Sequence, residues 1–437
     1  MKTIATAVFQ HAVETNQNIG QLLFDPAGEY ANVNVQDQTA LAQIGDQYVT
    51  IFRLGATGDE PGVRSLSTNF FSDSTIEVTW SIIRSGLSAW MTSGYVESFV
   101  SADVIGPENE RTDRSAYLRA QRRRCALYAT LIKAGFDTPG GFRTRLAVNR
   151  NIIDLINQNL TDSQAPQFST NHGTLTLNDH NIRLFWDSFL AAKDANTGNQ
   201  HLDRWIDSGL ETILTVYRGS TGRGFRLLEP LRVFHSPLRD QDYASEVLQE
   251  LISGKIVIVD LSLGSENVLQ FCSERIVNHI LTEASRRFAA GEEPYKIQIF
   301  IEEAHRLFNR DKMKAPSEAD PYVRLAKEAA KFKIGLIYAT QEVSSVDPLI
   351  LSNTSNWIVT HLNNRSEVKE LSKYYDFQDF AELTLKAEDV GFARLKTRSG
   401  RYIIPVHIDL FDRFKIDAAR NAALRTHQDR TQETIGD

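Results

Sequence analysis

Short, predominantly apolar runs bounded by polar residues recur at four places along the chain. Continuous apolar runs of this length are typical of strands that are buried on both faces, as in a parallel sheet. The runs are Gly20 to Phe24, Ile256 to Val259, Ile297 to Ile301 and Ile334 to Ala339. Helical patterns at Asn267 to Ala289 and at Pro321 to Lys333 separate the last three runs. This alternation predicts an α/β fold with a parallel sheet, right-handed crossovers and helices on both faces.

A stretch of about 180 residues, from Thr57 to His235, interrupts this alternation and is far longer than an ordinary connection between strands. Helical periodicity runs through it, for example at Arg114 to Ala134 and at Arg145 to Asn159. A mostly helical insertion domain is therefore expected. The expected divisions are a first part of the core at 1–56, the insertion at 57–235, the remainder of the core at 236–412 and a C-terminal helical extension or tail at 413–437.

Two further segments near the C-terminal end are also candidates for strands. They are Trp357 to Leu362 and Tyr402 to Ile408. They could extend the same sheet.

Charge and cysteine content limit the partners of the chain. It carries 48 basic and 55 acidic side chains, a net charge of −7. This excludes the uniformly basic surface of a histone-like nucleic-acid binder, so any DNA contact must come from a local patch. Cys125 and Cys272 are too few for a disulfide framework and lack CxxC spacing, which fits a reducing, cytoplasmic setting. No apolar stretch approaches the roughly 20 residues that cross a bilayer, so no membrane contact is expected.

Paired carboxylates follow one of the apolar runs, at the end of a strand where parallel sheets bind their ligands. Glu302 and Glu303 come directly after Ile297 to Ile301. One could hold a magnesium ion and the other could activate a water molecule, since adjacent side chains on an extended backbone point to opposite sides. The alternative, a strand that simply enters a solvated helix start where Glu is favoured, stays open.

Other polar motifs are less specific. Gln341, after the fourth run, could orient a water molecule or sense a phosphate, and a merely solvated amide is the alternative. The tetrad Glu-Glu-Ala-His at 302–305 lacks the second histidine that a metalloprotease zinc site needs, so zinc is not expected. The glycines of Gly219 to Gly224 do not form a G-x-x-x-x-G-K-[S/T] phosphate loop, and that pattern is absent from the sequence.

An arginine cluster lies within the expected insertion, where Asp113 is the one acid among fourteen residues. Its members are Arg111, Arg114, Arg119, Arg122, Arg123 and Arg124. Guanidinium groups at this density can bind phosphates or pair with the carboxylates of a partner. The alternative is a solvated helix face that acids elsewhere balance. Arg122, Arg123 and Arg124 are the candidates for contact with DNA or a partner protein.

Five sequence blocks together carry a family resemblance. In order, they are LLFDPAGEY, KIVIVDLSLGSE, IFIEEAHRLF, RLAKEAAKFKIGLIYATQEVSSVDPLILSNTSNWIVTHLNN and VGFARLKTRSGRYIIPVHID. They resemble the HerA-like branch of the FtsK/HerA superfamily of hexameric DNA-pumping ATPases. The resemblance covers roughly residues 1–56 and 236–412, whereas the insertion is similar only in position and character. It implies a RecA-like, P-loop-type parallel sheet that is incomplete at its N-terminus.

The resemblance also implies roles for residues at the strand ends, with ATP and Mg²⁺ as cofactors. Glu302 and Glu303 correspond to the Walker B pair, with Glu303 as general base and Glu302 as the acid that holds magnesium through water. Gln341 falls where the family has its γ-phosphate sensor. Asp25 and Glu29 lie in a D-P-x-G-E-Y block near the nucleotide. Asp260 belongs to a D-L-S block of structural role.

A ring of such subunits would hold ATP between neighbours, where the γ-phosphate needs a cation from the adjacent subunit. The candidates for this trans-acting cation are Arg324, Arg365 and, as a lysine substitute, Lys331. The family often has Gly-Arg-Lys where this chain has Ala329-Ala330-Lys331, so the assignment departs from the family pattern.

The family's glycine-rich phosphate loop and the small β-barrel before it are missing from the sequence, and Lys2-Thr3 has no glycine loop ahead of it. The chain is therefore expected to be the C-terminal part of a longer translocase and to turn over little or no ATP by itself. Removal of a strand from such a sheet is also expected to expose an apolar edge.

The implied function is ATP-driven translocation along, or unwinding of, double-stranded DNA. A homohexamer would carry it out together with a nuclease or an antiphage defence effector, in DNA repair or defence. The alternative is a non-catalytic ring or adaptor subunit that binds a partner protein. A dinucleotide-dependent oxidoreductase is disfavoured, because no G-x-G-x-x-G follows any expected strand.

Overall fold

The computed structural model describes residues 1–435 apart from short segments. The residues that it does not describe within this range are 36, 57–59, 108, 163–164, 220–221, 240, 264–265, 309–319, 376 and 387–389. The chain divides into two compact units. The first comprises Met1–Ser65 and Ala244–Asp437, and the second comprises Leu66–Tyr243.

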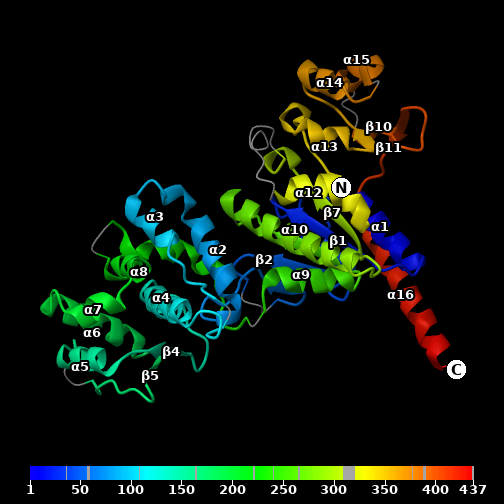
Figure 1. Ribbon diagram of the computed structural model, residues 1–437. Coiled ribbons are helices and arrows are strands. Elements are labelled where there is room, and N and C mark those ends of the chain that lie inside the picture. Colours follow the sequence, from blue (N-terminus) through cyan, green and yellow to red (C-terminus); the bar gives the residue numbers. More distant parts are fainter. Residues whose placement is uncertain are drawn as a thin grey trace. The chain divides into compact units, whose positions relative to one another are not determined.

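A parallel sheet of six strands forms the centre of the first unit, in the order β3-β2-β6-β1-β7-β8 (Figure 1). The strands are β1 (Ile19–Asp25), β2 (Val49–Arg53), β3 (Val63–Ser65), β6 (Ile256–Asp260), β7 (Lys296–Ile301) and β8 (Ile334–Tyr338). All four strands expected from the apolar runs are confirmed, and Leu22, Leu23 and Ile299 are completely buried. The fold is the α/β fold with a parallel central sheet that the alternation of apolar runs and helices predicts.

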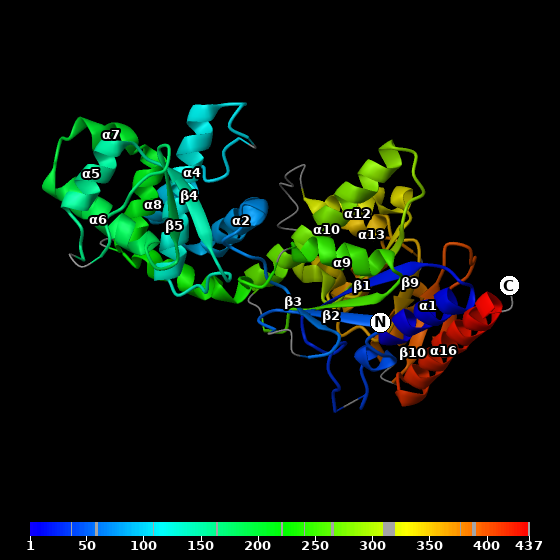
Figure 2. The ribbon, with the colours of Figure 1, turned by 90° about the horizontal axis from the view of Figure 1, so that it is seen from below.

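Helices cover both faces of this sheet (Figure 2). They are α1 (Lys2–Glu14), α9 (Tyr243–Ile252), α10 (Glu266–Ala289), α12 (Pro321–Glu328) and α16 (Arg413–Ile435). On one face, Phe9 of α1 and Ile416 of α16 pack in one cluster with Leu23, Ile258 and Phe300 of the strands. Figure 2 shows α9, α10 and α12 on the opposite face. Both faces are buried, which explains why the strands are continuous apolar runs in the sequence.

β3 and β8 form the two edges of the sheet. Among the described strands β8 pairs only with β7, although its residues are as apolar as those of the interior strands. Only Ile334 of β8 is fully buried, and the four residues after it are partly exposed. An apolar edge of this kind is open to pairing with a further strand.

The expectation that Trp357 to Leu362 and Tyr402 to Ile408 extend the parallel sheet is wrong. These segments supply β9 (Trp357–Val359) and β11 (Ile404–His407), which pair antiparallel with β10 (Phe392–Lys396) in a separate sheet. β10 lies between β9 and β11 and forms backbone hydrogen bonds with both strands, so neither needs a partner in the large sheet. The helices of this region are α13 (Pro348–Ser352), α14 (Arg365–Leu371) and α15 (Ala381–Lys386).

The second unit is mostly helical, as expected. Its helices are α2 (Ile76–Gly86), α3 (Gly94–Val100), α4 (Arg114–Lys133), α5 (Arg150–Gln158), α6 (Ile182–Ala195), α7 (Gln200–Trp205) and α8 (Ser208–Arg218). An antiparallel ribbon, β4 (Arg143–Ala147) and β5 (Thr174–Asn178), accompanies them. The predicted helix at Arg145 to Asn159 is wrong at its start, because Arg145 lies in β4. Helix α5 begins at Arg150, where the side chain of Asn149 accepts a hydrogen bond from the Ile152 N–H and caps the helix.

His235 is buried in the second unit, and both of its ring nitrogens contact backbone groups. Its Nδ1 accepts a hydrogen bond from the Phe70 N–H at 3.1 Å, and its Nε2 lies 2.6 Å from the backbone oxygen of Asp137. Since Nδ1 is an acceptor, Nε2 carries the proton and donates to Asp137. Burial lowers the pKa of His235, and the hydrogen bond to Asp137 opposes the shift only in part.

We therefore expect the second unit to lose stability as the pH falls from about 7 to about 5, because the unfolded histidine takes up a proton that the folded one resists. The melting temperature should fall over this range in the wild type and in His180→Asn, since the His180 side chain is exposed. It should fall less in His235→Asn, which has no titrating group at this position. The same pH dependence in all three chains would contradict the assignment to His235.

Candidate functional site

The paired glutamates and the glutamine lie together at the carboxyl ends of two neighbouring strands. Glu302 and Glu303 follow β7, and Gln341 follows β8, which pairs with β7 in parallel. Nε2 of Gln341 donates a hydrogen bond to Oε1 of Glu303 at 3.4 Å. The φ angle of Glu303 is 49°, a left-handed conformation in which the chain turns sharply away from the strand. The structure therefore brings the three predicted residues to one place.

Glu302 contacts Tyr30 and lies near the start of α1. The Tyr30 hydroxyl donates a hydrogen bond to Oε1 of Glu302. Burial, and then the negative charge of Glu302, raises the pKa of Tyr30 far above its ordinary value, so the phenol remains a donor. Burial lowers the pKa of the Met1 amino group, and the charge of Glu302 opposes that shift. The positive end of the α1 helix dipole therefore lies close to Glu302.

Glu303 is also close to His305. Its Oε2 lies 3.6 Å from Nδ1 of His305, and that nitrogen lies 3.2 Å from Oγ1 of Thr340. Both Glu302 and Glu303 are partly exposed, so water can reach them. Because each carboxylate has its own set of partners, one can act as a ligand while the other accepts a proton.

Sequence reasoning missed three of these partners, Tyr30, His305 and Thr340. Each lies beside a residue that it did select, since Tyr30 follows Glu29, Thr340 precedes Gln341, and His305 ends the Glu-Glu-Ala-His tetrad. The available signal was this adjacency, but adjacency alone does not show which side chains meet.

Asp25 organises the turn that follows β1. Its side chain is completely buried. Oδ1 accepts a hydrogen bond from the Glu29 N–H at 2.9 Å, and Oδ2 accepts from Tyr30 and Ala31 at 2.9 and 3.1 Å. Burial raises the pKa of Asp25, and these backbone hydrogen bonds lower it in part. Asp25 thus positions Tyr30, whereas the side chain of Glu29 is exposed.

Asp260, at the end of β6, is held by Arg53 from the end of β2. Nε of Arg53 lies 2.8 Å from Oδ2 of Asp260, whose side chain is 1% exposed. Ser262 donates to Oδ1 of Asp260 through both its backbone N–H and its hydroxyl. Arg53 also donates to Oδ1 of Asn32 at 2.9 Å, which ties this pair to the turn after β1. The contacts of Asp260 support the structural role implied for it.

The three candidates for a trans-acting cation differ in their surroundings. Arg324 lies 3.4 Å from Oγ of Ser285, and Nζ of Lys331 lies 4.0 Å from the centre of the Phe288 ring. Arg365 begins α14 and is exposed, and within the described residues its side chain has no ion pair or hydrogen bond. Glu367 of the same helix accepts hydrogen bonds from Ser344, which places α14 against the segment that follows Gln341.

The side chains of Arg122, Arg123 and Arg124 have partners within the second unit. Arg122 donates to the backbone oxygen of Trp205 at 2.8 Å, and its guanidinium lies 5.0 Å from the centre of that ring. Arg123 donates to Oδ1 of Asp207, and Arg124 donates to the backbone oxygen of Ile105. These contacts give all three residues an intramolecular role, and DNA binding by them stays a prediction.

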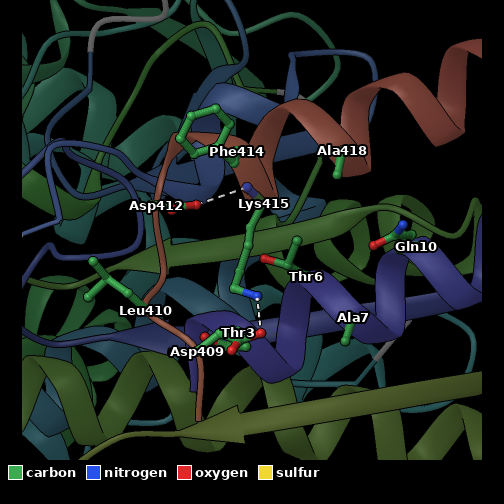
Figure 3. Close-up of a pocket in the computed structure, with 10 residues that line it drawn as sticks. All are labelled: Thr3, Thr6, Ala7, Gln10, Asp409, Leu410, Asp412, Phe414, Lys415 and Ala418. Atoms are coloured by element: carbon green, nitrogen blue, oxygen red, sulfur yellow. Dashed lines mark hydrogen bonds and ion pairs between the residues drawn. The ribbon is translucent and has the colours of Figure 1, made fainter. Parts of the chain in front are cut away.

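The cavity drawn in Figure 3 does not coincide with this site. It has a volume of about 500 Å³ and is lined by residues of α1, of α16 and of the segment before α16. Lys415 and Asp409, both in its lining, form an ion pair at 3.2 Å. None of Glu302, Glu303 and Gln341 belongs to the lining, so the cavity adds nothing to the case for a nucleotide site.

The carboxylates of the site suit a metal ion that is bound together with a phosphate-containing substrate. Among the described residues, no group of three or more His, Cys, Asp and Glu side chains could hold a metal ion. Glu302 and Glu303 offer the hard oxygen ligands that Mg²⁺ takes, and Mg²⁺ commonly completes its shell with water and substrate phosphates.

In the part of the chain that the structure describes, no helix is long and apolar enough to span a membrane.

Comparison with known proteins found sequence relatives over part of the chain, whereas no family model matches it. The DNA double-strand break repair helicase HerA of Sulfurisphaera tokodaii is 28% identical over 173 residues, which cover 39% of this chain and 34% of that protein. HerA of Sulfolobus acidocaldarius is 27% identical over 38% of this chain and 34% of its own length. The chain therefore matches about a third of the length of these relatives. The similarity confirms the expected resemblance to HerA over the part that it covers.

Solved structures were compared in the same way. VirB4 of Thermoanaerobacter pseudethanolicus aligns with a TM-score of 0.40 and 10% identity, covering 94% of this chain and 87% of that one. The genome packaging NTPase B204 of Sulfolobus turreted icosahedral virus 2, in complex with sulfate, aligns with a TM-score of 0.29 and 17% identity over 37% of this chain and 72% of that one. Because these TM-scores are low, the fold assignment rests on the order of the strands themselves.

Proposed function

We propose that this chain is a subunit of a HerA-type motor that hydrolyses ATP in order to move along double-stranded DNA. The observation that carries the proposal is the 3.4 Å hydrogen bond from Gln341 to Glu303, which links the ends of two adjacent parallel strands. Carboxylates and a polar amide at this edge of a parallel sheet are suited to phosphoryl transfer. The relatives from Sulfurisphaera tokodaii and Sulfolobus acidocaldarius are DNA double-strand break repair helicases, which supports DNA as the substrate.

Glu303 is the general base in this proposal. Gln341 and His305 orient its carboxylate, which takes a proton from the water that attacks the γ-phosphorus. Gln341, which donates a hydrogen bond to the base Glu303, is the proposed sensor of the γ-phosphate. Glu302, held by Tyr30, would hold Mg²⁺ through water, and the ion would supply positive charge to the phosphates of bound ATP.

The residues after β1 contribute in two ways. Asp25 holds the turn and thereby presents the Tyr30 hydroxyl to Glu302. Glu29 lies in the same turn with an exposed side chain, which leaves it available to contact the nucleotide.

The site is proposed to lie between subunits of a homohexamer that surrounds the DNA duplex. Arg365 is the first candidate for the cation that reaches a neighbour's γ-phosphate, because it is exposed and without a described partner, whereas Arg324 and Lys331 contact groups of their own chain. The ring is proposed to work with a nuclease or a defence effector as its partner.

ATPases of this kind bind phosphates in a cradle of backbone N–H groups, and the 437 residues contain no G-x-x-x-x-G-K-[S/T] pattern for such a loop. The start of α1 lies near Glu302, and its first residue, Lys2, forms an ion pair with Asp37. We propose that a phosphate loop beside the start of α1 is needed to complete the site, and that the chain as given turns over little ATP.

The test is an extension of the chain before Met1 by a strand and a glycine-rich loop that ends in Gly-Lys-Ser. In the extended chain we expect magnesium-dependent ATP hydrolysis that falls about 100-fold or more in Glu303→Gln, because the attacking water loses its base. Glu342→Gln is the matched control, because Glu342 follows Gln341 directly in the sequence. It should keep the wild-type rate, since the Glu342 carboxylate accepts a hydrogen bond from Ser345 and is not the proposed base. The chain without the extension should show little hydrolysis.

Other outcomes would favour the alternative, a non-catalytic ring or adaptor subunit. If the extended chain is folded, as judged by its melting temperature, but neither binds nor hydrolyses Mg-ATP, the ATPase proposal is wrong. Steady hydrolysis by the unextended chain that is lost in Glu303→Gln would show instead that no added phosphate loop is needed.

A further inference from the structure

The ribbon of β4 and β5 in the second unit has one face with only small, cationic and hydrogen-bonding side chains. Arg143 and Arg145 alternate along β4 and pair in register with Asn178 and Thr176 of β5. Alternate residues of a strand point to the same side of the sheet. The outer face therefore consists of Arg143, Arg145, Ala147, Thr174, Thr176 and Asn178.

The opposite face of the ribbon belongs to the core of the unit. Leu146, Leu175 and Leu177 are buried there. Oε1 of Gln121, on α4, accepts a hydrogen bond from the Ala147 N–H at 3.3 Å, and both views show the ribbon next to α4 (Figures 1 and 2). Because this face is committed to packing, the arginine face is the one that a partner of this unit can reach.

The two arginines of the outer face are exposed and have no described partner. Neither guanidinium makes an ion pair or a hydrogen bond within the described residues. Neither strand contains an acidic residue. This surface is therefore a local cationic patch on a chain of net charge −7.

The chemistry of the face selects a class of partner. Protein interfaces use aromatic and arginine anchors that surround a desolvated, largely apolar centre, and the outer face has arginines but no aromatic or large apolar side chain to form such a centre. Arginine, threonine and asparagine side chains are the donors that contact phosphate and sugar oxygens in complexes with DNA. An antiparallel ribbon of two strands also fits the major groove of B-DNA, which is about 12 Å wide.

We propose that the outer face of the β4–β5 ribbon is a contact of the second unit with double-stranded DNA, in which Arg143 and Arg145 bind backbone phosphates without reading the base sequence. The proposal rests on the proposed function, because it assigns part of the DNA-binding surface of the motor to a unit outside the ATPase core. The two arginines are about 6.7 Å apart along the strand, so each can meet a different phosphate.

The test measures binding of the full chain to a labelled DNA duplex of random sequence by fluorescence anisotropy at several salt concentrations. The ribbon variant is Arg143→Gln with Arg145→Gln. The matched control is Arg204→Gln with Arg226→Gln, which removes the same charge from exposed positions of the same unit. Near 0.1 M salt, the ribbon variant is expected to bind roughly tenfold more weakly or worse, and the slope of log K against log salt should shrink by about 2. The control should bind like the wild type.

Each other outcome overturns the inference. Unchanged affinity and slope in the ribbon variant would show that the ribbon does not bind DNA. The ATPase proposal would stay intact, since the hydrolysis test does not involve the ribbon. Absence of duplex binding by the wild type at low salt would also overturn the inference. Polyglutamate is the second probe: loss of polyglutamate binding with duplex binding retained would identify an acidic protein as the partner.

Folding of the variants is checked by their melting temperatures. If the Gln variant melts early, the pair Arg143→Lys with Arg145→Lys takes its place, because it keeps the charge and the length of the side chains. If the ribbon binds phosphates, the Lys variant should retain most of the wild-type slope of log K against log salt. A slope as low as that expected for the Gln variant would overturn the inference.

Discussion

Asp25→Ala is expected to lower the free energy of unfolding of the sheet-containing unit by about 3 kcal/mol or more. The buried carboxylate accepts three backbone hydrogen bonds, from Glu29, Tyr30 and Ala31. Alanine would leave these donors without an acceptor, at a cost of about 1–3 kcal/mol for each buried one, although such costs do not add in full. Urea denaturation followed by circular dichroism measures the loss.

Asp25→Asn provides a graded comparison for this prediction. Its single amide oxygen can replace only one of the two carboxylate oxygens, so an intermediate loss of stability is expected. Because the turn positions Tyr30 against Glu302, the alanine variant should also lose most of the ATP hydrolysis of the extended chain. A stability loss below about 1 kcal/mol for Asp25→Ala would contradict the inference that this carboxylate holds the turn.

Arg53→Met is expected to destabilise the same unit by about 3–5 kcal/mol. Asp260 is 1% exposed, and Arg53 is its described cationic partner at 2.8 Å. Methionine keeps much of the bulk of arginine but removes the charge, so the Asp260 carboxylate would remain buried and uncompensated. Removal of one partner of a buried pair is costly for this reason, whatever the net value of the pair itself. The same urea titration measures the effect.

Glu60→Gln is the control for the Arg53 prediction. Glu60 pairs with the same arginine at 3.2 Å, but its side chain is 68% exposed. Exposed ion pairs contribute about 0–1 kcal/mol, so this variant should lose less than about 1 kcal/mol. If both variants lost the same amount, burial of Asp260 would not be the cause.

The interior strands were predictable from the sequence because both faces of the sheet are covered, which requires nearly every residue of β1, β6 and β7 to be apolar. The strand β2 was missed, since Thr50 and Arg53 break its apolar run. The start of α5 was misplaced because Arg143–Ala147 lies in a helix-like stretch of sequence. Pairing with β5, about 30 residues later, makes it a strand, and such non-local pairing overrides local propensity.

The candidate site was only partly predictable. Glu302, Glu303 and Gln341 were found because the ends of parallel strands share one edge of a sheet, so their chain positions alone suggested proximity. Tyr30 was not found, because 272 residues separate it from Glu302 and only the order β1-β7-β8 brings the two together.

The sequence by itself determined the class of fold, the acids and the glutamine at the strand ends, and the absence of a glycine-rich GK[S/T] loop, because each depends on local residue type and spacing. The tertiary structure decided which side chains are free to act. Arg122, Arg123 and Arg124 contact groups far along the chain, whereas Arg143 and Arg145 have no such partners within the described residues. Burial and pairing of a charge depend on packing between distant segments, so the sequence does not show which arginines have partners within their own chain.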